Sequence, residues 1–243
     1  MPILLLGGTG EARALAARLH PEHDIVSSLA GRVPDPALPV GPVRIGGFGG
    51  VQGLRQWLRD NQIDAVVDAT HPFASTMTAH AAQVCAELNL PHLVLSRPPW
   101  DPGGAIRVAS DVEAAQVVAD EGFSRVFLTT GRSGVAPFTS SHAWFLIRVV
   151  TPPDTDLLPC NHEVLLSRGP YGYDDECALL RDNTIDVLVT KNSGGALTEA
   201  KLEAAENLGV TVVMIDRPAL PAGVAVVSTV DEAAEWVTDL EHH

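Results

Sequence analysis

Three glycines near the start of the chain stand where a backbone can bind a phosphate. Gly7, Gly8 and Gly10 follow the apolar run 3–6 and precede the helix-forming run 11–19. A strand, a glycine turn and a helix open a dinucleotide-binding unit, because amide N–H groups and the helix dipole then face the pyrophosphate. Thr9, Glu11 and Arg13 belong to the same candidate cofactor site. Arg13 replaces the third glycine of the strict motif, so an ordinary strand–helix turn stays an alternative.

The end of the second expected strand favours NADP over NAD. An acidic residue usually binds the ribose hydroxyls there, and this chain has Ser28 and Arg32 instead. A carboxylate would repel a 2′-phosphate, whereas a serine and an arginine are suited to bind one. The alternative is that Arg32 is an ordinary surface residue. Gly47, in the glycine-rich run 46–50, is expected in a loop over the cofactor.

Thr70 and His71 follow the expected strand 65–67, where the nicotinamide end of a cofactor should lie. Pro72 restricts His71 to an extended backbone, which presents its imidazole for anion binding or proton donation. A histidine that caps the next helix is the open alternative. Lys191 is the second candidate proton donor, and water could replace either residue.

Positive charge gathers at expected strand ends and loops of a strongly acidic chain. The net charge is −14 at pH 7, which argues against nucleic-acid binding. Cations around one cleft would attract a polyanionic ligand, although we expect some of them to form ordinary salt bridges. The candidate substrate-binding residues are Arg97, Arg132, Arg168, Tyr171, Lys191, Asn192, Ser193, Gly194, Lys201 and Arg217.

The second half of the chain repeats the first. Residues 58–64 recur as residues 180–186, and the segment 108–115 has its counterpart in 227–234. Apolar runs in both halves suit strands buried on both faces of a parallel sheet. We therefore expect an α/β fold of two similar Rossmann-like domains, with parallel sheets flanked by helices and a ligand cleft between them. The domains are expected at 1–98 and 106–239, while the packing of the strand–helix units 106–121 and 224–237 stays open.

Composition excludes several other classes of protein. No apolar run reaches transmembrane length, and the N-terminus lacks the basic region of a signal peptide. Cys85, Cys160 and Cys177 have no metal-ligand spacing, so we expect no metal and a reducing, cytoplasmic location. Residues 240–243 resemble the start of an engineered histidine tag and are not assigned to the fold. The sequence does not indicate an oligomeric state.

Several segments together resemble the precorrin-6A reductase family, over residues 3–237. They are Gly7-Gly8-Thr9-Gly10-Glu11, Ser28-Leu29-Ala30-Gly31-Arg32, Asp68-Ala69-Thr70-His71-Pro72-Phe73-Ala74, Thr129-Thr130-Gly131-Arg132, Gly169-Pro170-Tyr171 and Lys191-Asn192-Ser193-Gly194-Gly195. The resemblance implies an NADPH-dependent oxidoreductase of cobalamin biosynthesis that reduces a macrocycle double bond of precorrin-6A to give precorrin-6B. Its substrate would be a polycarboxylate tetrapyrrole, which fits the cationic loops.

Three alternatives to this activity stay open. The family also includes enzymes that act on the cobalt-containing intermediate, so a cobalt-precorrin-6A reductase is one. Another NADP-dependent reductase on the same doubled scaffold is the second. The third belongs to a different class and is a non-catalytic NADPH-sensing protein. No nucleophile elbow, Walker lysine or zinc-protease motif is present, and hydride transfer requires none of them.

Overall fold

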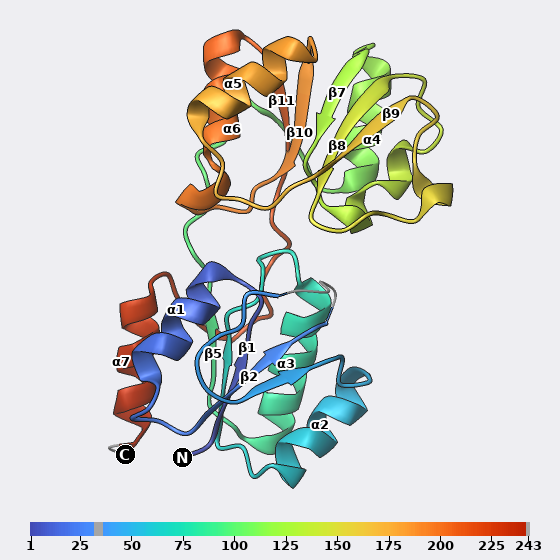
Figure 1. The fold of residues 1–243 in the computed structure, drawn as a ribbon. Helices are drawn as coiled ribbons and strands as arrows, with labels where there is room; N and C mark the ends of the chain where they lie inside the picture. Colours follow the sequence, from blue (N-terminus) through green and yellow to red (C-terminus); the bar gives the residue numbers. More distant parts are fainter. Residues whose placement is uncertain (32–35, 242–243) are drawn as a thin grey trace. The chain divides into compact units, whose positions relative to one another are not determined.

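The computed structural model describes residues 1–31 and 36–241, which form two α/β units on parallel sheets (Figure 1). One unit comprises Met1–Pro98 and the chain from Pro218 onward, and the other comprises Pro99–Arg217. Each sheet has six strands in the described chain, and all of the strand pairings are parallel. The expected fold class, two Rossmann-like domains with helix-flanked parallel sheets, is confirmed.

The sheet of the first unit has the strand order β12-β5-β4-β1-β2-β3. These strands are β1 (Ile3–Leu6), β2 (Ile25–Leu29), β3 (Val43–Ile45), β4 (Ala65–Asp68), β5 (His92–Leu95) and β12 (Ala225–Val227). Helices α1 (Gly10–Leu19) and α7 (Val230–Glu241) cover one face, and α2 (Gly50–Asp60) and α3 (Ser75–Leu88) cover the other (Figure 1). Alternate residues of β1 enter the two cores, Leu5 on the α1 side and Leu4 on the α3 side. Burial on both faces explains why this strand is a continuous apolar run.

The sheet of the second unit has the order β6-β11-β10-β7-β8-β9. Its strands are β6 (Ile106–Val108), β7 (Arg125–Leu128), β8 (Trp144–Val149), β9 (His162–Leu166), β10 (Val187–Lys191) and β11 (Thr211–Ile215). The helices are α4 (Asp111–Asp120), α5 (Tyr173–Asp182) and α6 (Ala200–Leu208), with the 3₁₀ turns η1 (Arg132–Gly134), η2 (Ala136–Phe138), η3 (Thr155–Leu157) and η4 (Ala196–Thr198). Phe127, Leu146 and Leu188 form a core with α5 and α6.

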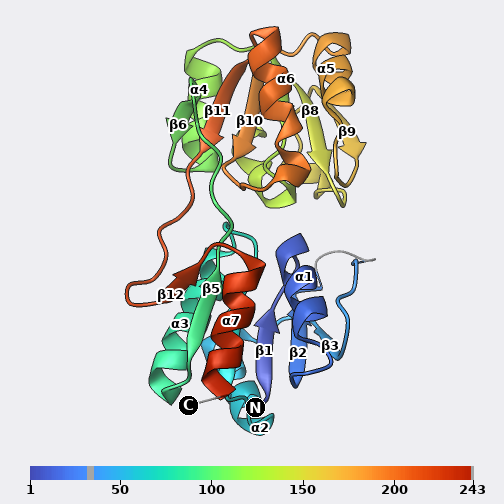
Figure 2. The same cartoon turned by 90° about the vertical axis from the view of Figure 1, so that its left-hand side faces the viewer.

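The two halves of the sequence exchange one strand and one helix: the elements that end each half pack in the unit formed by the other half. β6 and α4 follow β5 along the chain, yet β6 pairs with β11 of the second unit. β12 and α7 follow β11, yet β12 pairs with β5 of the first unit, with Val226 opposite Val94 (Figure 2). The second unit therefore ends at Arg217 instead of residue 239, because strand pairing carries residues 218–239 into the first unit.

The sequence repeat extends to the helix caps. Ser110 Oγ accepts from Glu113 N, while the Glu113 carboxylate accepts from the backbone N–H of Ala109. At α7, Thr229 Oγ1 accepts from Glu232 N, and the Glu232 carboxylate accepts from the backbone N–H groups of Ser228 and Thr229. Each pair is a capping box that satisfies N–H groups which a helix start leaves free.

The two halves differ in structure after β1 and after its counterpart β7. The first half continues into α1, whereas the second half forms η1 and η2 instead. Pro137 accounts for the difference, because a proline inside an α-helix lacks an N–H and clashes with the carbonyl four residues earlier.

Two expectations about the chain ends and membranes can be compared with the structure. Leu240 packs against the first core as part of α7, whereas the tag-like residues His242 and His243 lie outside the described residues. Within residues 1–31 and 36–241, no helix combines the length and the apolar character that a bilayer crossing requires.

The exchange of α7 predicts where a substitution in it will act. Val237→Ala removes buried methyl groups from the core of the first unit and should destabilise that unit by about 2 kcal/mol. Hydrogen exchange should then accelerate in β1 and β5, while β7 and β10 keep their protection. Val112→Ala, at a residue of α4 that is 66% exposed, is the control. If hydrogen exchange became faster in β7 and β10 instead, the assignment of α7 to the first unit would be wrong.

Candidate functional site

The glycine turn lies between β1 and α1, beside the point where the strand order reverses. Gly8 has φ = +113°, a conformation that glycine adopts without strain, and a Cβ there would meet no atom within 4 Å. The hydroxyl of Thr9 accepts from Ala12 N at 3.0 Å and donates to Ala69 O at 2.7 Å. The turn is thus fixed to the start of α1 and to the end of β4, with Gly8 open to a ligand.

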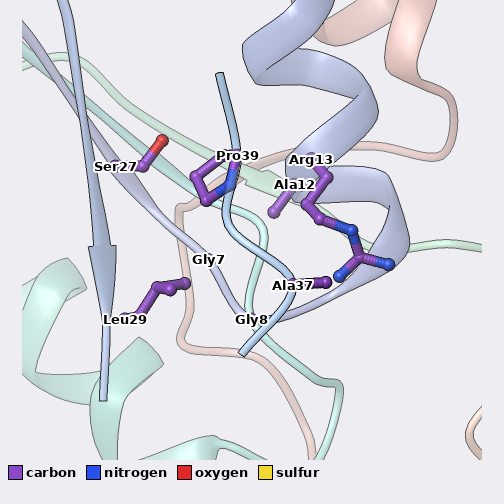
Figure 3. Close-up of a pocket in the computed structure, with 8 residues that line it drawn as sticks. All are labelled: Gly7, Gly8, Ala12, Arg13, Ser27, Leu29, Ala37 and Pro39. Atoms are coloured by element: carbon purple, nitrogen blue, oxygen red, sulfur yellow. The ribbon is translucent and has the colours of Figure 1, made fainter. Parts of the chain in front are cut away.

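A pocket adjoins this turn in the first unit (Figure 3). It is lined by Gly7, Gly8, Ala12, Arg13, Ser27, Leu29, Ala37 and Pro39. In Figure 3, Ser27 and Leu29 lie on one side of the turn, and Arg13 and Ala37 lie on the other. Arg13 donates to Thr9 O at 3.2 Å and forms no ion pair with a carboxylate of the described chain. The pocket wall therefore carries a positive charge where the motif would have its third glycine.

Ser28, at the end of β2, has an arginine partner that the sequence analysis missed. The sheet register sets Ser28 opposite Arg44 of β3, and Arg44 Nη1 donates to Ser28 Oγ at 2.9 Å. The guanidinium also donates to the carbonyls of Gly46 and Gly47 and lies 3.8 Å from the centre of the Phe48 ring. Burial lowers the pKa of Arg44, but an arginine stays protonated at neutral pH. Arg32, the other residue expected here, lies outside the described residues.

Thr70 and His71 follow β4, as the sequence indicates, and an aspartate holds Thr70. Asp68 Oδ1 accepts from Thr70 N at 3.0 Å and from Thr70 Oγ1 at 2.6 Å. His71 is exposed, and its Nδ1 accepts from Phe73 N at 3.3 Å. Helix α3 has no side-chain cap. The structure thus favours a presented imidazole over a histidine that caps the helix.

Glu11 and Arg97, expected to bind different ligands, contact each other inside the first unit. Arg97 Nη1 lies 2.7 Å from Glu11 Oε2, and both side chains are partly buried. This is one of the salt bridges that we expected among the candidate cations. The pair neutralises the acidic residue in the first turn of α1, where an anionic ligand would otherwise be repelled.

Lys191 ends β10 at the carboxyl edge of the second sheet. Its Nζ donates to Thr130 O at 3.0 Å and lies 3.4 Å from Asp111 Oδ2. Arg132 follows on η1 and is exposed, with no carboxylate partner among the described residues. Arg168 is also exposed, in the loop after β9. The structure therefore places several of the expected cations of the second unit at strand ends and loops.

The loop after β10 is held by residues that precede and follow it. The Asn192 side chain pairs with the backbone of Trp100, accepting from its N–H at 2.8 Å and donating to its carbonyl at 3.0 Å. The Trp100 indole donates to Gly195 O. Arg217 donates to the carbonyls of Asn192 and Ser193, and Gly194 is buried. Asn192 and Arg217 thus hold the loop that carries the other candidates.

Lys201, which is buried, and Tyr171, which is half-buried, lie near the buried ion pair of Arg148 and Glu176. Lys201 is 4% exposed, donates to Thr198 O at 2.7 Å and lies 4.5 Å from the Trp100 ring centre. The Tyr171 ring stacks on Arg148, which forms a buried bidentate pair with Glu176. Lys201 therefore packs inside the second unit, against Trp100 and the carbonyl of Thr198, and exposes little surface to a ligand in solvent.

Sequence reasoning missed the residues that hold its candidates in place. They are Arg44, Asp68, Trp100 and Asp111, each of which bonds to a candidate or to its loop. Arg44 had a detectable signal, because a lone arginine between Val43 and Ile45 interrupts a short apolar strand. The partnership of Asp111 with Lys191 had none, since it depends on the pairing of β6 with β11.

Together the two helix-flanked parallel sheets define a two-domain protein of the Rossmann-like α/β class. The chain belongs to the precorrin-6x reductase CbiJ/CobK family, whose model matches residues 2–238. As a member of this family it is an oxidoreductase.

Relatives named precorrin-6A reductase match nearly the whole length of the chain. Precorrin-6A reductase of Mycobacterium tuberculosis is 71% identical over 238 residues, 98% of each chain. The enzyme of the same name from Rhodococcus erythropolis is 53% identical, again over 98% of each chain. A solved structure titled CobK precorrin-6A reductase superimposes with a TM-score of 0.89 at 38% identity, covering 98% of this chain and 96% of that one. Relatives named cobalt-precorrin-6A reductase are 28–30% identical.

Burial of Lys201 predicts a pH-dependent stability. Desolvation, followed by the charge of Arg148, lowers the pKa of Lys201 to about 7. The unfolded chain binds this proton up to about pH 10, so stability should rise with pH from about 7 towards 10. Urea unfolding at pH 7 and pH 9 should show wild type gaining about 2 kcal/mol relative to Lys201→Met. An equal difference at both pH values would mean that the buried ammonium stays protonated.

Proposed function

We propose that this chain reduces one double bond of precorrin-6A to give precorrin-6B, with NADPH as the hydride donor, in cobalamin biosynthesis. The observation that carries the proposal is the open glycine turn at the switch point of a chain that belongs to this reductase family. The 71% identity with a precorrin-6A reductase, against 28–30% with cobalt-precorrin-6A reductases, favours the metal-free substrate.

The first unit would hold the coenzyme at the carboxyl ends of β1, β2 and β4. The pyrophosphate would lie on the backbone of Gly7, Gly8 and Gly10, at the start of α1. In an open α/β sheet the adenosine end extends towards β2, where Arg13 lines the pocket and Arg44 is bonded to Ser28. The end of β2 carries no acidic side chain. The positive charges of Arg13 and Arg44 therefore support NADPH over NADH as the coenzyme. Arg32 stays a third candidate for the 2′-phosphate.

The second unit would hold the carboxylates of the macrocycle. Arg132 is the best placed candidate, because it is exposed and has no carboxylate partner in the described chain. Lys191, Arg168, Tyr171 and the loop residues Ser193 and Gly194 are further candidates. Asn192, Lys201 and Arg217 would act by holding that loop, since their polar groups are engaged within the second unit.

The reduction adds a hydride to one carbon of the double bond and a proton to its neighbour. NADPH, when bound, supplies the hydride. His71 is exposed beside Thr70, and Lys191 carries ammonium protons next to Asp111, so either can deliver the proton. Positioning and charge neutralisation would supply most of the rate. The cytoplasmic location expected from the sequence stays a prediction.

The activity itself gives the first test. Purified protein mixed with NADPH and precorrin-6A should oxidise the coenzyme in proportion to enzyme, followed as a loss of absorbance of the reduced nicotinamide. NADPH without a tetrapyrrole should stay unoxidised, and precorrin-6B should accumulate in equal amount. Tight NADPH binding without any turnover would instead support a sensing protein.

Coenzyme selectivity gives a second test. Arg13→Gln should weaken NADPH binding at least about tenfold, the effect of losing a charge-assisted hydrogen bond, and leave NADH affinity unchanged. Arg18→Gln, at the far end of the same helix, is the control. Fluorescence titration with both coenzymes measures each affinity. Equal losses for NADPH and NADH would place Arg13 on a phosphate that both share and remove its 2′-phosphate role.

A further inference from the structure

Asp68 is a buried carboxylate with one oxygen left without a donor. The residue is 1% exposed at the end of β4. Its Oδ1 accepts both bonds from Thr70, whereas no hydrogen-bond donor of the described chain reaches its buried Oδ2. Such a group costs folding free energy, because an ionised carboxylate away from water normally requires a cation or several donors.

Neighbouring titratable groups leave the charge of Asp68 uncompensated. Burial lowers the pKa of His92 more than the charge of Asp68 raises it, so the imidazole is neutral at neutral pH. Burial, together with Asp68, raises the pKa of the Cys85 thiol to about 12. No arginine or lysine of the described chain forms an ion pair with Asp68. Within the described chain, no cationic side chain therefore pairs with Asp68, and its Oδ2 stays without a donor.

Thr70 connects the buried Asp68 to the partly exposed end of β4. Its backbone N–H and its hydroxyl both donate to Asp68, so the hydroxyl oxygen has only lone pairs left to offer. Thr70 is half-buried, and the preceding residue, Ala69, accepts the bond from Thr9 of the glycine turn. The register sets Asp68 beside Leu6, the last residue of β1. Asp68 and Thr70 thus adjoin the coenzyme turn, on the side opposite β2.

We infer that Asp68 is a positioning residue that fixes Thr70 as a hydrogen-bond acceptor for the nicotinamide carboxamide and favours the positively charged, oxidised ring. The inference rests on the proposed NADPH site, in which the nicotinamide lies on the β4 side of the switch point. Loss of a hydride turns the ring from neutral to cationic. A fixed negative charge nearby then stabilises the state in which that charge develops.

The ratio of the two coenzyme affinities tests this role without turnover. Asp68→Asn keeps an acceptor for Thr70 and removes the charge, so it should weaken NADP⁺ at least about tenfold more than NADPH. Thr70→Val keeps the charge and should weaken both forms alike. Asp64→Asn, at an exposed residue just before β4, should leave the ratio unchanged.

A loss that is equal for NADP⁺ and NADPH in Asp68→Asn, or no loss at all, would overturn the inference while leaving the reductase proposal intact. Wild-type protein that fails to bind NADPH would overturn both. If Asp68→Asn does not fold, wild type can be titrated with NADP⁺ and with tetrahydro-NADP, whose ring is neutral. NADP⁺ should bind about tenfold more tightly, and equal affinities would overturn the inference.

Discussion

The hydroxyl group of Thr9 connects the three parts of the candidate coenzyme site. As an acceptor it caps α1, and as a donor it bonds to Ala69 at the end of β4. A helix start with a fixed cap keeps its remaining N–H groups aimed at the turn, where an anion can bind. The same bond ties the glycine turn to Thr70 and, through it, to the buried Asp68. An alanine at this position would remove both bonds and leave the end of β4 joined to β1 by the backbone bond from Ala69 N to Leu6 O.

Local features of the site were readable from the sequence, and long-range ones were not. The glycine turn and the helix caps depend on residues a few positions apart, and the repeat is a direct match of residue types. All three can therefore be recognised in the sequence. Arg44 depends on the register between β2 and β3, which brings it to Ser28 across the sheet. The burial of Lys201 depends on Trp100, which lies a hundred residues earlier in the chain. The sequence did not predict which sheet β6 and β12 join, because a three-residue strand carries too little pattern to specify its partner.

The second unit shows how one copy of a repeat can differ from the other in local structure and charge. Its central strand β7 continues into 3₁₀ turns where β1 of the first unit continues into α1, so the end of β7 lacks the long capped helix on which a pyrophosphate could bind. Cations occupy the equivalent strand ends, and several of them are engaged by the protein itself, as Arg217 and Lys201 are by backbone carbonyls. That engagement rigidifies the loop after β10. A rigid loop loses little conformational entropy when it meets a large, highly charged ligand.

The reciprocal exchange of β6–α4 and β12–α7 also has a consequence for biosynthesis on the ribosome. The second unit is continuous from Pro99 to Arg217, whereas the sheet of the first unit lacks its edge strand until the chain beyond Pro218 has emerged. Domains generally fold as units during translation. The first unit, although its first strand is made first, is therefore the last to be completed. Until then it exposes the side of β5 to which β12 will pair, and an exposed strand edge of this kind promotes aggregation.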